Sequence, residues 1–205
     1  MCGGAKINCA ARPGALTDAE RLVFMRVISG TARGRRLTEL PGMDTRPTTN
    51  KVKEALFNII QFELEGRRVL DLFGGTGQLG IEALSRGAKA AVFVDAGEPA
   101  CRLIRENLRR TKLEADARVI RSDYLEYLKR CRESFDIIFL DPPYAEVFLE
   151  NALNCIGEID ILQSGGIIVT ERPLGKDLNV ELTGFERSKD YKYGKTILAI
   201  YRKAE

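Results

Sequence analysis

The stretch VLDLFGGTGQLG, residues 69–80, decides the fold class of this chain. It opens with an apolar run that stops at two glycines, which is the pattern of a buried strand closed by a tight turn. The segment GIEALSRG (80–87) then has apolar residues at helical spacing and ends at Gly87, a residue favoured after a helix C-terminus. A strand, a glycine turn and a helix in this order predict the first unit of a parallel sheet.

The same alternation continues toward the C-terminus. Further apolar runs indicate strands, and amphipathic segments separate them. The stretch 185–202 holds two extended runs around Lys192-Tyr193-Gly194, which predicts a closing antiparallel pair. We therefore expect an α/β fold, with a mostly parallel sheet and helices on both faces. The expected strands are 69–73, 90–95, 117–123, 135–141 and 165–172, and the expected helices are 80–87, 100–111, 124–131 and 147–156.

The N-terminal part has a different pattern. Residues 1–24 show no clear periodicity, and we expect them to form an irregular, dispensable extension. Residues 26–46 alternate weakly around three glycines, which predicts a short hairpin, and a helix is expected to begin near Thr48 or Thr49. The expected organisation is an extension (1–24), a hairpin and helix (25–62) and an α/β domain (66–203).

Composition excludes several kinds of chemistry. The 205 residues include no histidine, which removes Ser-His-Asp, Cys-His and imidazole acid–base catalysis. The five cysteines contain no Cys-x-x-Cys pair, so we expect no metal site of the common zinc types. No apolar run approaches the roughly 18 residues of a membrane span, and residues 1–24 lack the apolar h-region of a secretory signal. We expect a cytoplasmic protein with reduced thiols that does not interact with membranes.

Positive charge is concentrated in one segment. Residues 26–53 carry seven basic and two acidic side chains, a net charge of +5, whereas the whole chain carries +3. Clustered charge of this kind suits a polyanion such as RNA, although basic runs are more often only solvated. The candidate RNA contacts are Arg33, Arg35, Arg36, Arg46, Lys51 and Lys53.

The glycine loop predicts a nucleoside-bearing cofactor. Gly75-x-Gly77-x-x-Gly80 matches the dinucleotide fingerprint, and Asp95 ends the next expected strand, where it can accept hydrogen bonds from a ribose. The loop alone does not separate a nicotinamide cofactor from S-adenosylmethionine, since both contain adenosine. Asp71 favours S-adenosylmethionine, because its carboxylate attracts an ammonium group and repels a pyrophosphate.

The motif Asp141-Pro142-Pro143-Tyr144 follows the fourth expected strand. An aromatic amine is a poor nucleophile because its lone pair is delocalised into the ring. Acceptors for both of its N–H groups, here the Asp141 carboxylate and the Pro142 carbonyl, can hold the amine and favour pyramidal geometry. The prolines fix the backbone, and Tyr144 offers a face for stacking a base. A Pro-Pro loop without a function is the competing interpretation.

At this point the chain resembles the amino-methyltransferases, which modify adenine N6, cytosine N4, guanine N2 or glutamine amides. More narrowly, it resembles the RsmD family, which methylates the 2-amino group of a guanine in 16S ribosomal RNA. The similar segments are MRVISGTARGRRL (25–37), RPTTNKVKEALFNII (46–60), VLDLFGGTGQLGIEALSRGA (69–88) and FDIIFLDPPY (135–144). The resemblance implies a Rossmann-like methyltransferase fold with a seven-strand sheet, an N-terminal hairpin and a helix.

The resemblance also implies roles for individual residues. Gly74, Gly75 and Gly77 would line the methionine end of S-adenosylmethionine, and Asp95 would hold its ribose. Asp123 and Tyr124 would face the adenine, and Asp141 to Tyr144 would hold the target base. The loop departs from the family pattern, because Gly75, Thr76 and Gln78 stand where Ala, Ser and Ala are common.

We therefore expect a monomeric S-adenosylmethionine-dependent methyltransferase that acts on ribosomal RNA or the small ribosomal subunit. A DNA adenine or protein glutamine amino-methyltransferase is the first alternative. An NAD-dependent oxidoreductase and a non-catalytic RNA-binding factor are alternatives from other classes.

Overall fold

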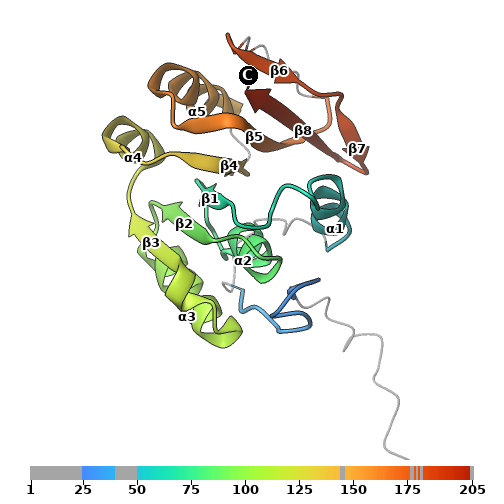
Figure 1. Ribbon diagram of the computed structural model, residues 1–205, viewed down its shortest axis with the longest axis vertical. Coiled ribbons are helices and arrows are strands. Elements are labelled where there is room, and N and C mark those ends of the chain that lie inside the picture. Colours follow the sequence, from blue (N-terminus) through green and yellow to red (C-terminus); the bar gives the residue numbers. More distant parts are fainter. Residues whose placement is uncertain are drawn as a thin grey trace, which may run out of the picture.

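The computed structural model describes residues 25–39, 50–143, 146–175, 178, 180 and 182–203. The expected extension (1–24) and the expected helix start at Thr48 or Thr49 lie outside these residues. One sheet runs through the described part, with helices on both faces (Figure 1). None of the described helices is long and apolar enough to cross a membrane. The strands are β1 (Arg68–Asp71), β2 (Ala90–Asp95), β3 (Ala117–Arg121), β4 (Phe135–Leu140), β5 (Leu162–Pro173), β6 (Phe185–Arg187), β7 (Tyr191–Tyr193) and β8 (Thr196–Lys203).

The order of strands across the sheet is β3-β2-β1-β4-β5-β8-β6. Strands β1 to β5 are parallel, and β8 pairs antiparallel with β5. Strands β6 and β7 pair with consecutive parts of β8, so eight strands occupy the seven positions that the family resemblance implied. The order reverses at β1, which lies between β2 and β4. In sheets of this kind, ligands bind beyond the carboxyl ends of the strands at such a reversal.

The helices divide into two layers that cover opposite faces. Apolar side chains of α1, α2 and α3 pack with alternate residues of the central strands, among them Phe93 and Phe139. Side chains of α4 and α5 pack with the intervening residues, among them Val92 and Ile138. Burial on both faces explains why these strands are continuous apolar runs. The helices are α1 (Asn50–Ile59), α2 (Gln78–Ser85), α3 (Glu98–Thr111), α4 (Tyr124–Arg130) and α5 (Glu146–Ile159), with a short 3-10 helix (Glu114–Asp116) before β3.

The expected elements are confirmed with small shifts at their ends. Helix α2 begins at Gln78 rather than Gly80, because Gly77 has a φ of 79° and places the next residue in the first turn. Strand β5 begins at Leu162, which pairs with Phe135 before a register shift.

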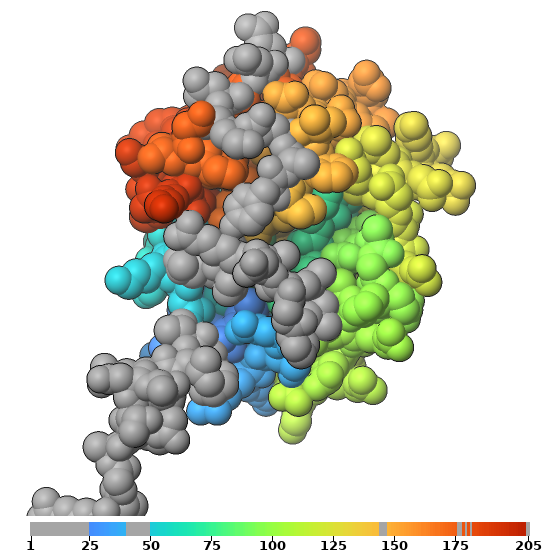
Figure 2. All heavy atoms as spheres, turned by 180° about the vertical axis from the view of Figure 1, so that it is seen from behind, coloured from blue at the N-terminus to red at the C-terminus, as the bar shows by residue number. Residues whose placement is uncertain are grey.

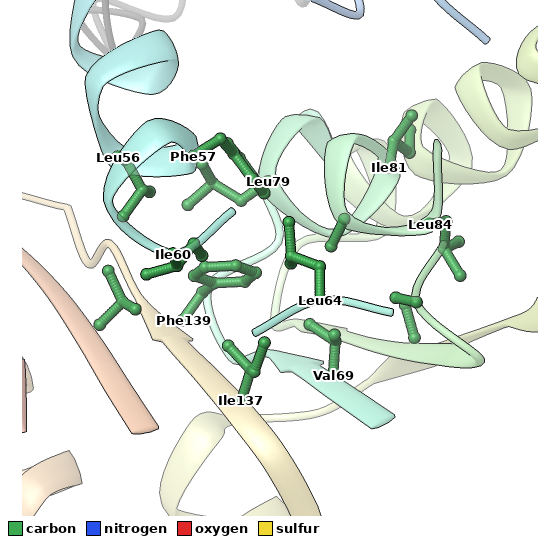
Figure 3. Close-up of a cluster of buried hydrophobic side chains, with 14 of the residues drawn as sticks. Leu56, Phe57, Ile60, Leu64, Val69, Leu79, Ile81, Leu84, Ile137 and Phe139 are labelled. Carbon is green, nitrogen blue, oxygen red and sulfur yellow. The ribbon is translucent and has the colours of Figure 1, made fainter. Parts of the chain in front are cut away.

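The N-terminal hairpin is part of the main hydrophobic core. Its strands meet at a bridge between Arg26 and Arg36, and Leu37 N donates to Met25 O at 2.9 Å. Met25, Val27 and Leu37 are buried in the cluster that also contains α1 and α2. Figure 3 shows Phe57 of α1 and Ile60, in the turn after α1, beside Phe139 and Ile137 of β4, with Leu79 of α2 close by. The hairpin and α1 are therefore integrated with the α/β sheet rather than separate from it.

Candidate active site

A cavity of about 950 Å³ lies beyond the carboxyl ends of β1, β2 and β4. Three segments that are far apart in sequence line it: the loop after β1, the end of β2, and Asp141-Pro142-Pro143 after β4. Because β1 is hydrogen-bonded to both β2 and β4, the sheet itself brings these segments together. The volume is in the range of small-molecule and cofactor sites.

The glycine loop lies against β2 and the N-terminus of α2. Gly74 N donates to Val94 O at 2.8 Å, and Gly77 N donates to Gly74 O at 2.6 Å. Gly75 and Gly77 have φ values of 53° and 79°, in the left-handed region that favours glycine. A Cβ on Gly74 would lie 2.8 Å from Ile104 Cδ1, whereas a Cβ on Gly75 would approach only Phe73 O, at 3.9 Å. Gly75 therefore leaves open space on the side of the cavity, as a loop that contacts a ligand through its backbone requires.

Asp95 joins the glycine loop to the end of β2. Its Oδ2 accepts a hydrogen bond from Gly75 N at 2.8 Å, and its Oδ1 accepts one from Gly97 N at 2.8 Å. Each carboxylate oxygen has a second lone pair, so these bonds leave capacity for the two hydroxyls of a ribose. The side chain thus has a role that spacing did not predict: it fixes the conformation of the loop.

Asp71 is a buried acid in the wall of the cavity, with 2% of its surface exposed. Its Oδ2 accepts a hydrogen bond from Gly80 N at 3.1 Å. Burial raises the pKa of Asp71 to about 8; the Gly80 hydrogen bond acts against this rise, and the negative charges of Asp141 and Asp95 add to it. Three carboxyl groups therefore act on one cavity, and this arrangement favours a cationic ligand over an anionic one.

Asp123 and Tyr124 lie at the start of α4, beside the same cavity. The Asp123 carboxylate caps the helix by accepting from Leu125 N at 2.9 Å and Glu126 N at 3.2 Å. The buried Tyr124 ring lies 5.1 Å from the ring of Phe73 and 5.6 Å from that of Phe148. These aromatic rings give this part of the wall an apolar character suited to a planar ligand.

Asp141, Pro142 and Pro143 follow β4 and line the cavity, where Asp141 is half-buried. Tyr144 lies outside the described residues, so its stacking role stays a prediction.

The cavity also has walls that spacing did not predict. Arg172, at the end of β5, is buried and donates to Asp190 Oδ2 at 2.5 Å. Tyr193 is the last residue of β7, and Lys195 lies in the turn between β7 and β8. The closing antiparallel pair was predicted, but nothing in its composition placed it beside the glycine loop. Gln78, the first residue of α2, was noted only as a departure from the family pattern.

The candidate RNA contacts do not share one environment. Arg33, Arg36 and Lys51 are exposed, and Lys51 lines the cavity. Arg35 is half-buried, with Nη1 donating to Arg110 O at 3.1 Å. Arg46 lies outside the described residues. Figure 2 shows the hairpin, in blue, on the molecular surface between α1 (cyan) and α3 (green).

The assignment of Lys53 to RNA binding is wrong. The side chain is fully buried, its Nζ donates to Arg26 O at 2.7 Å, and it lies 3.7 Å from Glu82 Oε2. Burial lowers the pKa of Lys53 to about 8, against the opposing effect of Glu82. The Glu82 carboxylate also accepts from Ile28 N at 2.7 Å and Ser29 N at 2.9 Å. Lys53 and Glu82 therefore hold the hairpin onto α1 and α2, because helical spacing places Lys53 on the inner face.

A second polar contact joins the hairpin to the glycine loop. The buried side chain of Asn107 accepts from Thr38 N at 2.8 Å and donates to Thr76 O at 2.9 Å. Thr38 belongs to the hairpin segment and Thr76 to the loop, so α3 bridges the two.

Comparison with known proteins is consistent with this geometry. A family model described as "Conserved hypothetical protein 95" matches residues 25–202. YlbH of Bacillus subtilis, which carries a provisional rRNA methyltransferase name, is 42% identical over 182 residues, covering 87% of this chain and 99% of the relative. "Ribosomal RNA small subunit methyltransferase D" of Haemophilus influenzae is 36% identical, covering 75% of this chain and 81% of the relative.

Among solved structures, yhhF of Escherichia coli, provisionally titled a methyltransferase, superposes with a TM-score of 0.79 at 30% identity. It covers 87% of this chain, and 97% of that structure is matched. The chain therefore belongs to the family described as "Conserved hypothetical protein 95", which is the RsmD family that its motifs indicated.

Proposed function

We propose that this protein is an S-adenosylmethionine-dependent methyltransferase that modifies the exocyclic 2-amino group of a guanine in 16S ribosomal RNA. One observation carries the proposal: a single cavity is lined by the glycine loop and Asp95 on one side and by Asp141-Pro142-Pro143 on the other. A cofactor site and an amine-holding motif are thus adjacent. The Bacillus and Haemophilus relatives are named as ribosomal RNA methyltransferases, and the second name specifies the small subunit.

The residues present fit S-adenosylmethionine. The ligand carries a sulfonium and an ammonium, which suit the carboxyl groups of Asp71, Asp95 and Asp141. Gly74 to Gly77 would contact its methionine end, Asp95 its ribose, and Asp123 with Tyr124 its adenine. A nicotinamide dinucleotide fits less well, because its pyrophosphate would face the same acids. When bound, S-adenosylmethionine supplies an electrophilic methyl group.

The protein's own contribution is to hold the amine. The Asp141 carboxylate and the Pro142 carbonyl would each accept a hydrogen bond from one N–H group of the amine. The nitrogen lone pair would then be directed toward the methyl donor. Asp141 need not remove a proton beforehand, since the amine becomes acidic once its nitrogen is bonded to the methyl carbon. The target base must leave its stack to enter the cavity, at a cost of a few kcal/mol that contacts to RNA phosphates offset. Arg33, Arg36 and Lys51 are exposed and suitable for such contacts.

The decisive experiment is mass spectrometry of ribosomal RNA from a strain that lacks this protein. One missing N2-methylguanosine in 16S RNA, restored by the purified protein with S-adenosylmethionine, is the expected result. Transfer of label to DNA or to a release factor, with unmodified RNA, would support the amino-methyltransferase alternatives instead. Unchanged RNA modification and no transfer to any of these substrates would refute the proposal.

A further inference from the structure

Gln78 is a buried polar residue in the cavity wall whose side chain lacks one expected partner. It is the first residue of α2, only 8% of its surface is exposed, and it lines the cavity. Among the described residues, none donates a hydrogen bond to its Oε1. Burying an amide oxygen without a donor costs free energy, and such groups are few in folded proteins. An unpaired acceptor in the wall of a ligand cavity therefore indicates that the ligand supplies the donor.

We infer that Gln78 is a binding residue for the amino-acid head of the cofactor, with its Oε1 accepting a hydrogen bond from the ligand's ammonium group. The inference rests on the proposed function, because it takes S-adenosylmethionine or its product as the ligand. It assigns a role to one of the three residues at which the loop departs from the family pattern.

The surroundings of Gln78 favour an ammonium over a neutral donor. Gly80, in the same first turn of α2, donates to Asp71 Oδ2 at 3.1 Å, so the Asp71 carboxyl lies against the turn that Gln78 begins. A primary ammonium has three N–H donors and can serve several acceptors at once. The amide oxygen of Gln78 adds an acceptor without adding a further negative charge beside Asp71, Asp95 and Asp141.

The same turn suits the other end of the amino-acid head. Backbone N–H groups at a helix N-terminus carry partial positive charge and bind carboxylates. Helix α2 therefore offers a donor surface for the carboxylate next to acceptors for the ammonium. This arrangement would orient the amino-acid head of the ligand, with Gln78 between the ammonium site and the carboxylate site.

Two variants separate hydrogen bonding from packing. Gln78→Met keeps the length of the side chain but has no amide oxygen, whereas Gln78→Ala removes most of the side chain. We expect Gln78→Ala to fold, since alanine is common at this position in the family that the sequence resembles, and Gln78→Met to fold, since methionine has a similar length and a good helix propensity. Gln61→Met is the matched control, because Gln61 is exposed in the turn after α1.

The probes are S-adenosylhomocysteine, which carries the amino-acid head, and 5′-methylthioadenosine, which shares the thioether nucleoside but lacks that head. Calorimetry of the full-length protein measures both affinities. We expect both Gln78 variants to bind S-adenosylhomocysteine roughly tenfold more weakly or worse, the scale of a hydrogen bond to a charged group. Their affinity for 5′-methylthioadenosine should stay within about twofold of wild type. Gln61→Met should change neither affinity.

Each other outcome overturns the inference. Equal losses for both probes would show a structural role for Gln78. Unchanged affinity for S-adenosylhomocysteine would remove Gln78 from the cofactor site, and reduced RNA methylation in that case would place it at the target base. A wild-type protein that binds neither probe would refute the proposed function itself, together with this inference.

Discussion

Asp71 should release its proton when the cofactor binds. In the unliganded protein, burial and two neighbouring carboxylates raise the pKa of Asp71 to about 8. At pH 7 an acid with that pKa is roughly 90% protonated. An ammonium group beside it stabilises the carboxylate, so the pKa falls and the proton leaves for the buffer. The α-amino group of S-adenosylhomocysteine is already protonated at pH 7, so the release, up to roughly 0.9 proton, comes from Asp71.

The assay is calorimetric titration of S-adenosylhomocysteine at pH 7 in two buffers with different ionisation enthalpies. The difference between the two binding enthalpies, divided by the difference in ionisation enthalpy, gives the number of protons released. A folded-state pKa one unit lower would still give roughly half a proton from Asp71. Cofactor affinity should also rise with pH between about 6 and 8, because Asp71 is then protonated in a smaller fraction of the unliganded protein and fewer molecules must lose that proton on binding.

Asp71→Asn is the perturbation, and it should bring the release close to zero. Asp116→Asn is the control, since exposed Asp116 does not line the cavity and the change leaves the Asp71 carboxyl and its neighbours in place. In the absence of ligand, the wild-type free energy of unfolding should fall as pH rises from 3.8 toward about 8, because folded Asp71 keeps a proton that the unfolded chain has lost. Asp71→Asn should remove that slope. Equal binding enthalpies in both buffers for wild type, or an undiminished release in Asp71→Asn, would refute the reasoning.

Three further predictions concern other parts of the molecule. In single-turnover methylation of the RNA, Asp141→Asn should keep measurable activity, because its side-chain oxygen can still accept a hydrogen bond from the target amine. Asp141→Ala should lose on the order of 10²–10³ in rate. Equal, near-complete loss in both variants would point to proton transfer instead. Replacing Arg33 and Arg36 with Gln should weaken binding to RNA of every sequence, and the slope of the logarithm of the binding constant against the logarithm of salt concentration should flatten by at most about two. Cofactor affinity should not change, and an unaltered RNA affinity would show that both arginines are only solvated charges. Lys53→Met should lower the free energy of unfolding in denaturant by about 3 kcal/mol, because Glu82 loses a buried partner and keeps only the ion pair with Arg86, whose Nε lies 2.8 Å from Glu82 Oε1. Exposed Lys51→Met should change it by less than about 0.5 kcal/mol; a neutral Lys53→Met would show that the pair contributes nothing.

The sheet was predictable because its strands are buried on both faces. Runs such as FDIIFLD stand out as apolar segments, and glycines or charged turns mark their ends. The line of acids at Asp71, Asp95 and Asp141 followed from the rule that parallel strands present their carboxyl ends at one edge. What could not be predicted was how segments pack when no periodic pattern links them. The turn between β7 and β8 lines the cavity only because β8 pairs with β5, a pairing that no local sequence encodes.

Charge proved a weaker guide than periodicity. A count of basic residues cannot separate Lys53 from Lys51, although the two differ by half a helical turn and occupy opposite environments. The apolar spacing of α1 contained the necessary signal, since Lys53 lies next to Val52 and one turn before Phe57 on the inner face. Weighing each charged residue by its place on the expected helix would have shown that Lys53 is a structural ion-pair partner.

The bridge through Asn107 has a consequence for how the enzyme aligns its two substrates. One amide side chain holds both Thr38 of the hairpin and Thr76 of the glycine loop, and Thr76 Oγ1 also contacts Met25 Sδ at 3.3 Å. The hairpin, which we propose as an RNA-binding surface, and the glycine loop, which we propose as the cofactor loop, are therefore both attached to helix α3. We expect these contacts to set the separation of the two segments before either substrate binds. For an RNA bound to the hairpin, the distance from the hairpin to the cofactor loop would then select the target, because only a base at that distance from the bound phosphates would reach the methyl group.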